Sequence, residues 1–148
     1  MTTTDYQHSF TVPASMETVY AALTAGIPAW WTEDFSGKAT QPGEVFTVRF
    51  GGTFMTFRID AALPGHKLTW TCTDNLQDMP GLSHRTEWIG TRMHWQLTPE
   101  GNGTHLEMVH EGLNPEVECW NICQQGWNFF LGSLRKVLEG EKGDTWKV

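Results

Sequence analysis

The chain has 148 residues, the length of one ordinary domain, and 39% of them are apolar, which is enough for a packed core. Only 18% are charged, so a disordered chain is not expected. Acidic residues outnumber basic ones by 17 to 10, and the resulting net charge of -7 disfavours binding to phosphate backbones or anionic lipid. No apolar run approaches membrane-spanning length. We therefore expect one domain over residues 1–148 that neither binds nucleic acid nor inserts into a membrane.

The N-terminal segment MTTTDYQHSF has neither the charged region nor the apolar region of a secretory signal. The three cysteines, Cys72, Cys119 and Cys123, are odd in number and show no paired framework. These features predict a cytoplasmic protein with reduced thiols.

The first thirty residues predict a strand followed by two short helices. Apolar and polar residues alternate over residues 6–12, as in a half-buried strand. Ser15 is a suitable N-cap for a helix over residues 16–23. The glycine at 26 and the proline at 28 end this helix, and residues 27–31 then resemble a second, very short one.

From residue 44 to residue 112 the hydrophobic period changes to two, which is typical of strands. We expect strands near 45–50, 55–59, 68–72, 85–98 and 104–111, with a loop over 74–83 and Gly90 as a bulge in the longest strand. The last two strands form a hairpin whose apolar faces match if Leu97 pairs with Leu106, Trp95 with Met108, and Met93 with His110. This register points His110 towards the interior.

The C-terminal region predicts one long helix. Asn114 is a plausible N-cap and Pro115 suits the first helical position. From Cys119 to Leu138 the large apolar residues fall on one stripe of the helix, which would lie on the sheet, and Gly140 would end it. The tail 141–148 is expected to be loosely held.

Five segments in this order resemble the START-like, or SRPBCC, superfamily. They are VPASMETVYAALT at 12–24, WW at 30–31, PGHKLTWTC at 64–72, TRMHWQLTPEGNGTHLEMVHEGL at 91–113 and GWNFFLGSLRKVLEG at 126–140. The closer similarity is to the family of the C-terminal domain of activators of the heat-shock protein 90 ATPase. The resemblance implies an α+β helix-grip fold, in which a curved antiparallel sheet wraps around a long C-terminal helix and two short helices follow the first strand.

The same resemblance implies a pocket between sheet and helix that holds a small hydrophobic molecule. Eight tryptophans in one domain favour this interpretation, because aromatic walls with a few polar groups suit an apolar ligand. We expect the cavity to be lined by Trp30, Trp31, Phe46, Met55, Trp70, Cys72, Met93, Trp95, Met108, His110, Cys119, Trp120, Cys123, Trp127 and Phe130.

The two cysteines of the helix, Cys119 and Cys123, are four residues apart. At this spacing their Cβ atoms lie roughly 5–6 Å apart, whereas a disulfide needs roughly 3.5–4.5 Å, so a bridge would distort the helix. No C-x-x-C or H-E-x-x-H spacing accompanies them. Packing in the pocket wall is favoured over metal binding, and we expect neither a metal nor a cofactor.

His110 is the candidate catalytic residue. Its inward side chain could be a hydrogen-bonded structural group, could orient a ligand, or could serve as acid and base in a cyclase-like or hydrolase-like enzyme. No partnered nucleophile or carboxylate is evident, so a binding protein is favoured over an enzyme.

Two further interactions stay open. Ile122 and Phe129, seven residues apart at the edge of the helical stripe, could cover a loop or form a homodimer contact. The activator branch of the superfamily binds a chaperone, so a protein-interaction module is an alternative function. The 148 residues contain no counterpart of the activators' separate N-terminal domain, which disfavours a chaperone partner.

Overall fold

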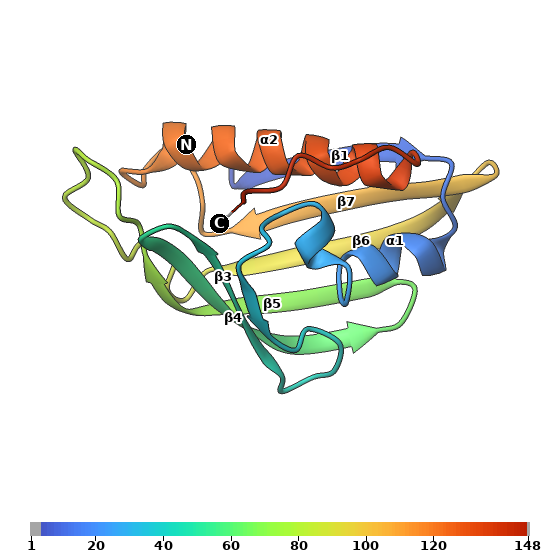
Figure 1. Ribbon diagram of the computed structural model, residues 1–148, viewed down its shortest axis with the longest axis horizontal. Coiled ribbons are helices and arrows are strands. Elements are labelled where there is room, and N and C mark those ends of the chain that lie inside the picture. Colours follow the sequence, from blue (N-terminus) through green and yellow to red (C-terminus); the bar gives the residue numbers. More distant parts are fainter. Residues whose placement is uncertain (1–3, 148) are drawn as a thin grey trace.

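The computed structural model describes residues 4–147. In chain order its elements are β1 (Tyr6–Val12), α1 (Met16–Ala22), the 3-10 helix η1 (Ile27–Ala29), β2 (Phe35–Gly37), β3 (Val45–Phe50), β4 (Thr53–Leu63), β5 (Lys67–Leu76), β6 (Arg92–Glu100), β7 (Gly103–Glu111) and α2 (Trp120–Leu138). The strands form one antiparallel sheet in the order β1-β7-β6-β5-β4-β3-β2. The long helix α2 runs along this curved sheet, and α1 lies towards the C-terminal end of α2 (Figure 1). The predicted α+β helix-grip fold is confirmed.

The β6–β7 hairpin has the register that the alternation of its residues predicted. Leu97 pairs with Leu106, Trp95 with Met108, and Met93 with His110. All six side chains are buried, because residues two apart on a strand share the face that packs under α2. His110 therefore does point into the interior.

The first helix is held at both ends by side-chain hydrogen bonds. Ser15 caps α1 by accepting a hydrogen bond from the Thr18 backbone N–H at 3.1 Å. After the turn through η1, the Trp30 indole N–H donates to the Ala22 carbonyl oxygen at 2.7 Å. This bond satisfies both the buried indole and a carbonyl of the helix end, so it fixes the two adjacent tryptophans, Trp30 and Trp31, against the sheet.

The predicted strand over residues 85–98 is wrong in its first half. Residues 77–91 form a loop that ends in two tight turns, with the Ile89 N–H donating to the Thr86 carbonyl and the Thr91 N–H to the Trp88 carbonyl. Gly90 has a positive φ of 89°, as a turn requires, and β6 begins only at Arg92. Gly90 is therefore a turn residue and not a bulge.

The predicted helix start is also wrong. Asn114 accepts a hydrogen bond from the Glu116 N–H, but it caps a turn, because the next backbone bonds span three residues. The first bond with α-helical spacing runs from the Cys123 N–H to the Cys119 carbonyl at 2.8 Å. The helix α2 thus begins at Trp120, five residues later than Pro115 suggested.

Residues 141–147 of the tail are not loosely held, in contrast to the expectation, and residue 148 lies outside the described residues. Trp146 exchanges backbone hydrogen bonds with Trp31 and Glu33 on the segment after η1. The Asp144 N–H donates to the buried Ser133 hydroxyl at 2.6 Å, and the Asp144 carboxylate pairs with an exposed lysine of α2. The tail therefore folds back beside α2 (Figure 1). The Trp146 ring contacts Phe50 at the end of β3, with centroids 6.3 Å apart.

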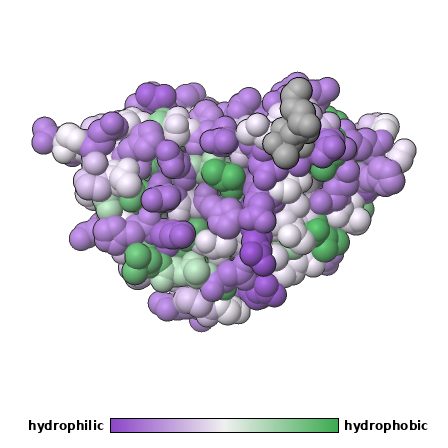
Figure 2. Space-filling view, turned by 180° about the vertical axis from the view of Figure 1, so that it is seen from behind, coloured by the Kyte–Doolittle hydropathy of each residue, from purple (hydrophilic) through white to green (hydrophobic). Residues whose placement is uncertain are grey.

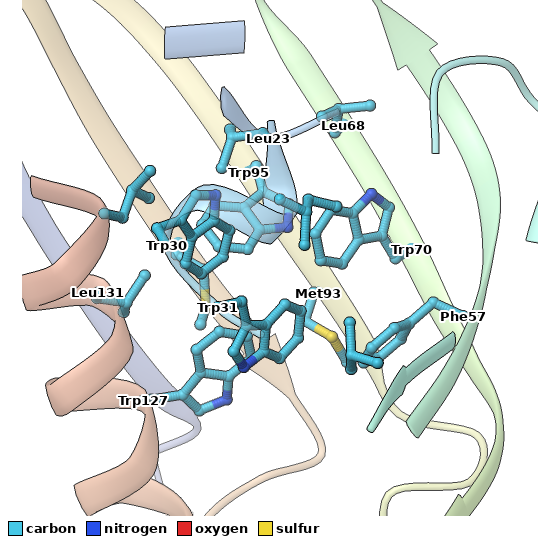
Figure 3. Packing of buried hydrophobic residues seen from close by; sticks show 14 of the residues in the cluster. Leu23, Trp30, Trp31, Phe57, Leu68, Trp70, Met93, Trp95, Trp127 and Leu131 are labelled. Carbon is cyan, nitrogen blue, oxygen red and sulfur yellow. The ribbon is translucent and has the colours of Figure 1, made fainter. Parts of the chain in front are cut away.

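The space between α2 and the sheet is largely filled by aromatic side chains (Figure 3). Trp30 stacks on Trp31 with ring centroids 5.3 Å apart, and Trp70 contacts Trp95 at 5.2 Å. Trp127 reaches down from α2 to contact Trp31 at 5.1 Å. This packing divides the interior into a solid centre and, at one end, a hollow.

Candidate functional site

The hollow is a cavity of about 370 Å³ between α2, the ends of β3 and β4, the loop 77–91 and the tail. This volume lies at the small end of the range usual for small-molecule sites. The lining residues are Trp31, Phe50, Thr53, Met55, Gln77, Asp78, Met79, Trp88, Ile122, Cys123, Gly126, Trp127, Phe130 and Trp146. They are mostly apolar or aromatic, with a few polar groups.

Three tryptophans form the buried wall of the cavity. Trp88 and Trp127 are nearly parallel, with an interplanar angle of 13° and centroids 5.9 Å apart. Trp31 contacts Trp127 on the side that faces β3 and β4. Farther out, Phe50 contacts both Phe130 and Trp146. The wall is therefore a continuous series of rings from the core to the surface.

Gly126 leaves the cavity open on the side of α2. A Cβ atom at this position would meet no atom within 4 Å. Glycine inside a helix costs roughly 0.5–1 kcal/mol relative to alanine, so a glycine in the second turn of α2 needs a structural reason. Because Gly126 has no side chain, the space that a larger residue would fill stays part of the cavity.

The loop 77–91 is fixed to the N-terminal end of α2. Glu118 accepts hydrogen bonds from the Ser83 and His84 backbone N–H groups, and these bonds hold the pKa of its carboxyl below the ordinary value. In return, Glu87 accepts hydrogen bonds from the N–H groups of Glu118 and Cys119. Because Glu118 and Glu87 each accept two hydrogen bonds across this contact, the loop is fixed in place. It therefore presents Trp88 and Gln77 to the cavity as a preformed wall.

Of the fifteen residues predicted to line a cavity, the structure brings Trp31, Met55, Cys123, Trp127 and Phe130 to this one. Nine of the others are buried side chains of the filled interior: Trp30, Phe46, Trp70, Cys72, Met93, Trp95, Met108, His110 and Cys119. Trp120 is half-buried beside Tyr6, away from the cavity. A ligand-binding role for any of these residues stays a prediction.

Sequence reasoning missed most of the polar and loop residues of the cavity. Trp88 was missed because residues 85–98 were assigned to one strand, and Gln77 was missed because residues 74–83 were assigned to a loop. Trp146 was missed because the tail was expected to be loose. The glycine at position 126, inside a strongly apolar helix, was the one signal in the sequence that could have marked the cavity.

His110 is a satisfied, neutral structural residue. Its Nδ1 accepts a hydrogen bond from the Trp127 indole N–H at 3.0 Å. Its Nε2 lies 2.8 Å from the Thr91 hydroxyl, which donates onward to the Trp88 carbonyl, so Nε2 carries the proton. Burial, with a smaller effect of His94, lowers the pKa of His110 to about 3. Both nitrogens are occupied and His110 does not line the cavity, so its geometry does not place it as an acid or base there.

Cys119 and Cys123 form a disulfide, which corrects the expectation of two free thiols. The bridge is compatible with the helix because Cys119 precedes its first residue, and the two Cα atoms are 5.6 Å apart. Cys72 is a free, buried thiol whose pKa burial raises to about 12. Within residues 4–147, no three His, Cys, Asp or Glu side chains gather closely enough to hold a metal ion. No helix of the same residues is long and apolar enough to span a bilayer.

The depressed pKa of His110 predicts a pH dependence of stability. The unfolded chain binds a proton near the ordinary value of 6.5 and the folded chain only near 3, so unfolding takes up a proton between these values. Stability therefore falls as the pH falls below 6.5, by up to about 1.4 kcal/mol per pH unit from this residue. We expect the free energy of unfolding of His110→Gln, measured with urea, to change less steeply with pH between 6.5 and 5 than that of the wild type. Equal slopes in the variant and the wild type would contradict a neutral, buried His110.

Comparison with known proteins agrees with this architecture. Residues 13–139 match the family model described as activator of Hsp90 ATPase homolog 1-like protein. The solution structure of the Aha1 dimer from Colwellia psychrerythraea is 30% identical, covers 97% of this chain and 100% of that chain, and has a TM-score of 0.76. No curated protein matches the chain.

Two more distant structures share the fold. A protein of Mesorhizobium loti is 22% identical over 91% of this chain and 96% of its own, with a TM-score of 0.73. A protein of the dynemicin biosynthetic locus is 23% identical over 94% of this chain and 49% of its own, with a TM-score of 0.69. With the family model covering most of the sequence, the chain belongs to the Aha1-like family of the SRPBCC superfamily.

Proposed function

We propose that the protein binds a small hydrophobic or aromatic molecule in the cavity beside α2. The observation that carries the proposal is the glycine at 126, which keeps open a hollow walled by Trp31, Trp88 and Trp127 in an otherwise filled interior. Interiors pack densely, and an unfilled apolar space costs stability. A ligand that fills the space would recover those contacts.

The surface supports an interior site. The face seen in Figure 2 is mostly hydrophilic, with separate hydrophobic spots rather than a broad apolar area. The exposed large apolar residues of the described chain come from six separate positions on several elements. The face in Figure 2 therefore offers no broad apolar area that would compete with the cavity for a small apolar ligand.

Filling the cavity from α2 is the direct test. We expect Gly126→Leu to weaken binding of the uncharged fluorescent probe N-phenyl-1-naphthylamine at least tenfold, because the new side chain occupies the site. The helix itself should tolerate the change, since leucine is a better helix former than glycine. Fluorescence titration measures the affinity, and thermal unfolding checks the fold.

The matched control is Gly132→Leu on the exposed side of the same helix, where an added Cβ also meets no atom within 4 Å. This variant should bind the probe as the wild type does. Equal binding by wild type and Gly126→Leu would contradict the proposed site.

An enzyme that uses His110 is not supported by the geometry of that residue, which is fully buried and bonded through both nitrogens. The second candidate function is regulation of a chaperone, which the description of the family model favours. Addition of the purified chain to an Hsp90-type chaperone should then raise its ATPase rate. No change in rate at a severalfold excess of the chain would contradict this alternative.

We also propose a cytoplasmic homodimer, supported by the Aha1 dimer of the 30% identical relative. Phe129 on α2 is 56% exposed and is the most exposed aromatic side chain of that helix. Light scattering should give twice the chain mass of 16.8 kDa, and Phe129→Asp should shift the mass towards the monomer. A monomer at all concentrations would contradict the dimer.

A further inference from the structure

The inner wall of the cavity contains one buried amide, Gln77. It directly follows β5 and is only 2% exposed. Its backbone is fixed, because its N–H donates to the Arg85 carbonyl and its carbonyl accepts from the Met79 N–H. The side chain is therefore held against the cavity and is not free to swing into solvent.

The hydrogen-bonding capacity of this amide is largely unused. A carboxamide offers two N–H donors and an oxygen that can accept two bonds. Among residues 4–147, the partner of the Gln77 side chain is the Cys123 sulfur, 3.3 Å from Nε2, and sulfur is a weak acceptor. The same sulfur also lies 3.5 Å from Oε1, so among the described residues both ends of the amide meet a weak partner. A buried polar group in this state is costly, and a ligand group that pairs with it removes the cost.

The charge of the lining selects against anions. Among the described residues, Asp78 is the one charged member of the lining, and its carboxylate pairs at 3.3 Å with Arg85, which does not line the cavity. None of the lysines, arginines and histidines within residues 4–147 lines the cavity. An anion placed between apolar rings without a counter-ion would lose its hydration without compensation. The net charge of -7 acts in the same direction.

The ring arrangement selects a flat ligand. Trp88 and Trp127 lie within 13° of parallel, and Trp31 is tilted by 33° from Trp127. Aromatic walls of this kind gain most from offset stacking or edge contacts with another ring. The volume of about 370 Å³ suits a small ring system better than a long acyl chain.

We propose that the site takes an uncharged aromatic molecule with one hydrogen-bonding substituent, and that Gln77 is the residue that recognises this substituent. This inference rests on the proposed function. It adds the ligand class and a specificity-determining residue, which the fold and the family do not provide.

The test compares three naphthalenes that share a ring system and differ in one group: 2-naphthylmethanol, 2-methylnaphthalene and 2-naphthoate. Each displaces N-phenyl-1-naphthylamine from wild type, from Gln77→Met, and from the exposed control Gln125→Met, with the affinity of each protein for the probe measured first. The quantity of interest is the ratio of the methylnaphthalene Kd to the naphthylmethanol Kd, because it cancels general changes in the cavity.

We expect this ratio to fall about 3- to 10-fold in Gln77→Met, as for the loss of one neutral hydrogen bond, and to stay unchanged in Gln125→Met. The naphthoate should bind wild type at least tenfold more weakly than naphthylmethanol. If Gln77→Met does not fold, Gln77→Asn withdraws the amide by one methylene and should lower the ratio in the same way.

An unchanged ratio in the folded Gln77 variant would overturn the assignment of Gln77. Tight binding of the naphthoate would overturn the uncharged ligand class. Either result leaves the cavity as a binding site, because the probe itself still binds. Failure of the wild type to bind the probe at all would instead overturn the proposed function.

Discussion

Trp127 is the side chain on which the arrangement of helix, sheet and loop depends. It extends from the middle of α2, donates its indole hydrogen to His110 on β7, and packs between Trp31 and Trp88. Its hydrogen bond requires a neutral His110, and that neutrality is maintained by burial, with a smaller effect of His94. One ring thus fixes the height of α2 above the sheet and the position of the loop that carries Trp88.

The cavity follows from the same contact. Towards the C-terminal end of α2, leucine side chains at 131, 134 and 138 fill the space over the sheet. Towards the N-terminal end, the helix presents Gly126 and the small Cys123, and nothing from the sheet reaches far enough to replace the missing volume. The loop 77–91 closes this end, because Glu87 and Glu118 tie it to the start of the helix. A solid core at one end therefore supports a hollow at the other.

The sequence was sufficient for the fold and for much of its register. Alternation placed Leu97, Trp95 and Met93 opposite their partners on β7, because a shift of one residue would have turned every apolar side chain to solvent. The same logic could not locate the cavity. Periodicity tells which face of a strand or helix is inward, but it does not tell whether the space behind that face is filled. Trp70 and Trp95 are inward and fully packed, whereas Trp31 and Trp127 border the hollow.

The loop residues escaped prediction for a different reason. Gln77 and Trp88 lie in a loop, where the sequence has no hydrophobic periodicity that could show which side chains face inward. The position of this loop depends on hydrogen bonds to residues more than thirty positions away in the chain. The late start of α2 was hidden by Asn114 and Pro115, which are good helix-start residues used here in a turn. The disulfide was likewise excluded on the premise that both cysteines lie inside the helix, which the structure shows is not the case.

The central claim is that a ligand enters the cavity and not the core. The indole N–H signals of the eight tryptophans test this claim most directly. In a two-dimensional nitrogen–proton spectrum, each indole N–H gives its own signal. Titration with 2-naphthylmethanol should shift the signals of Trp31, Trp88, Trp127 and Trp146 and leave those of Trp30, Trp70 and Trp95 in place. Shifts centred on Trp70 and Trp95, or no shift of any indole signal at saturating ligand, would contradict the account.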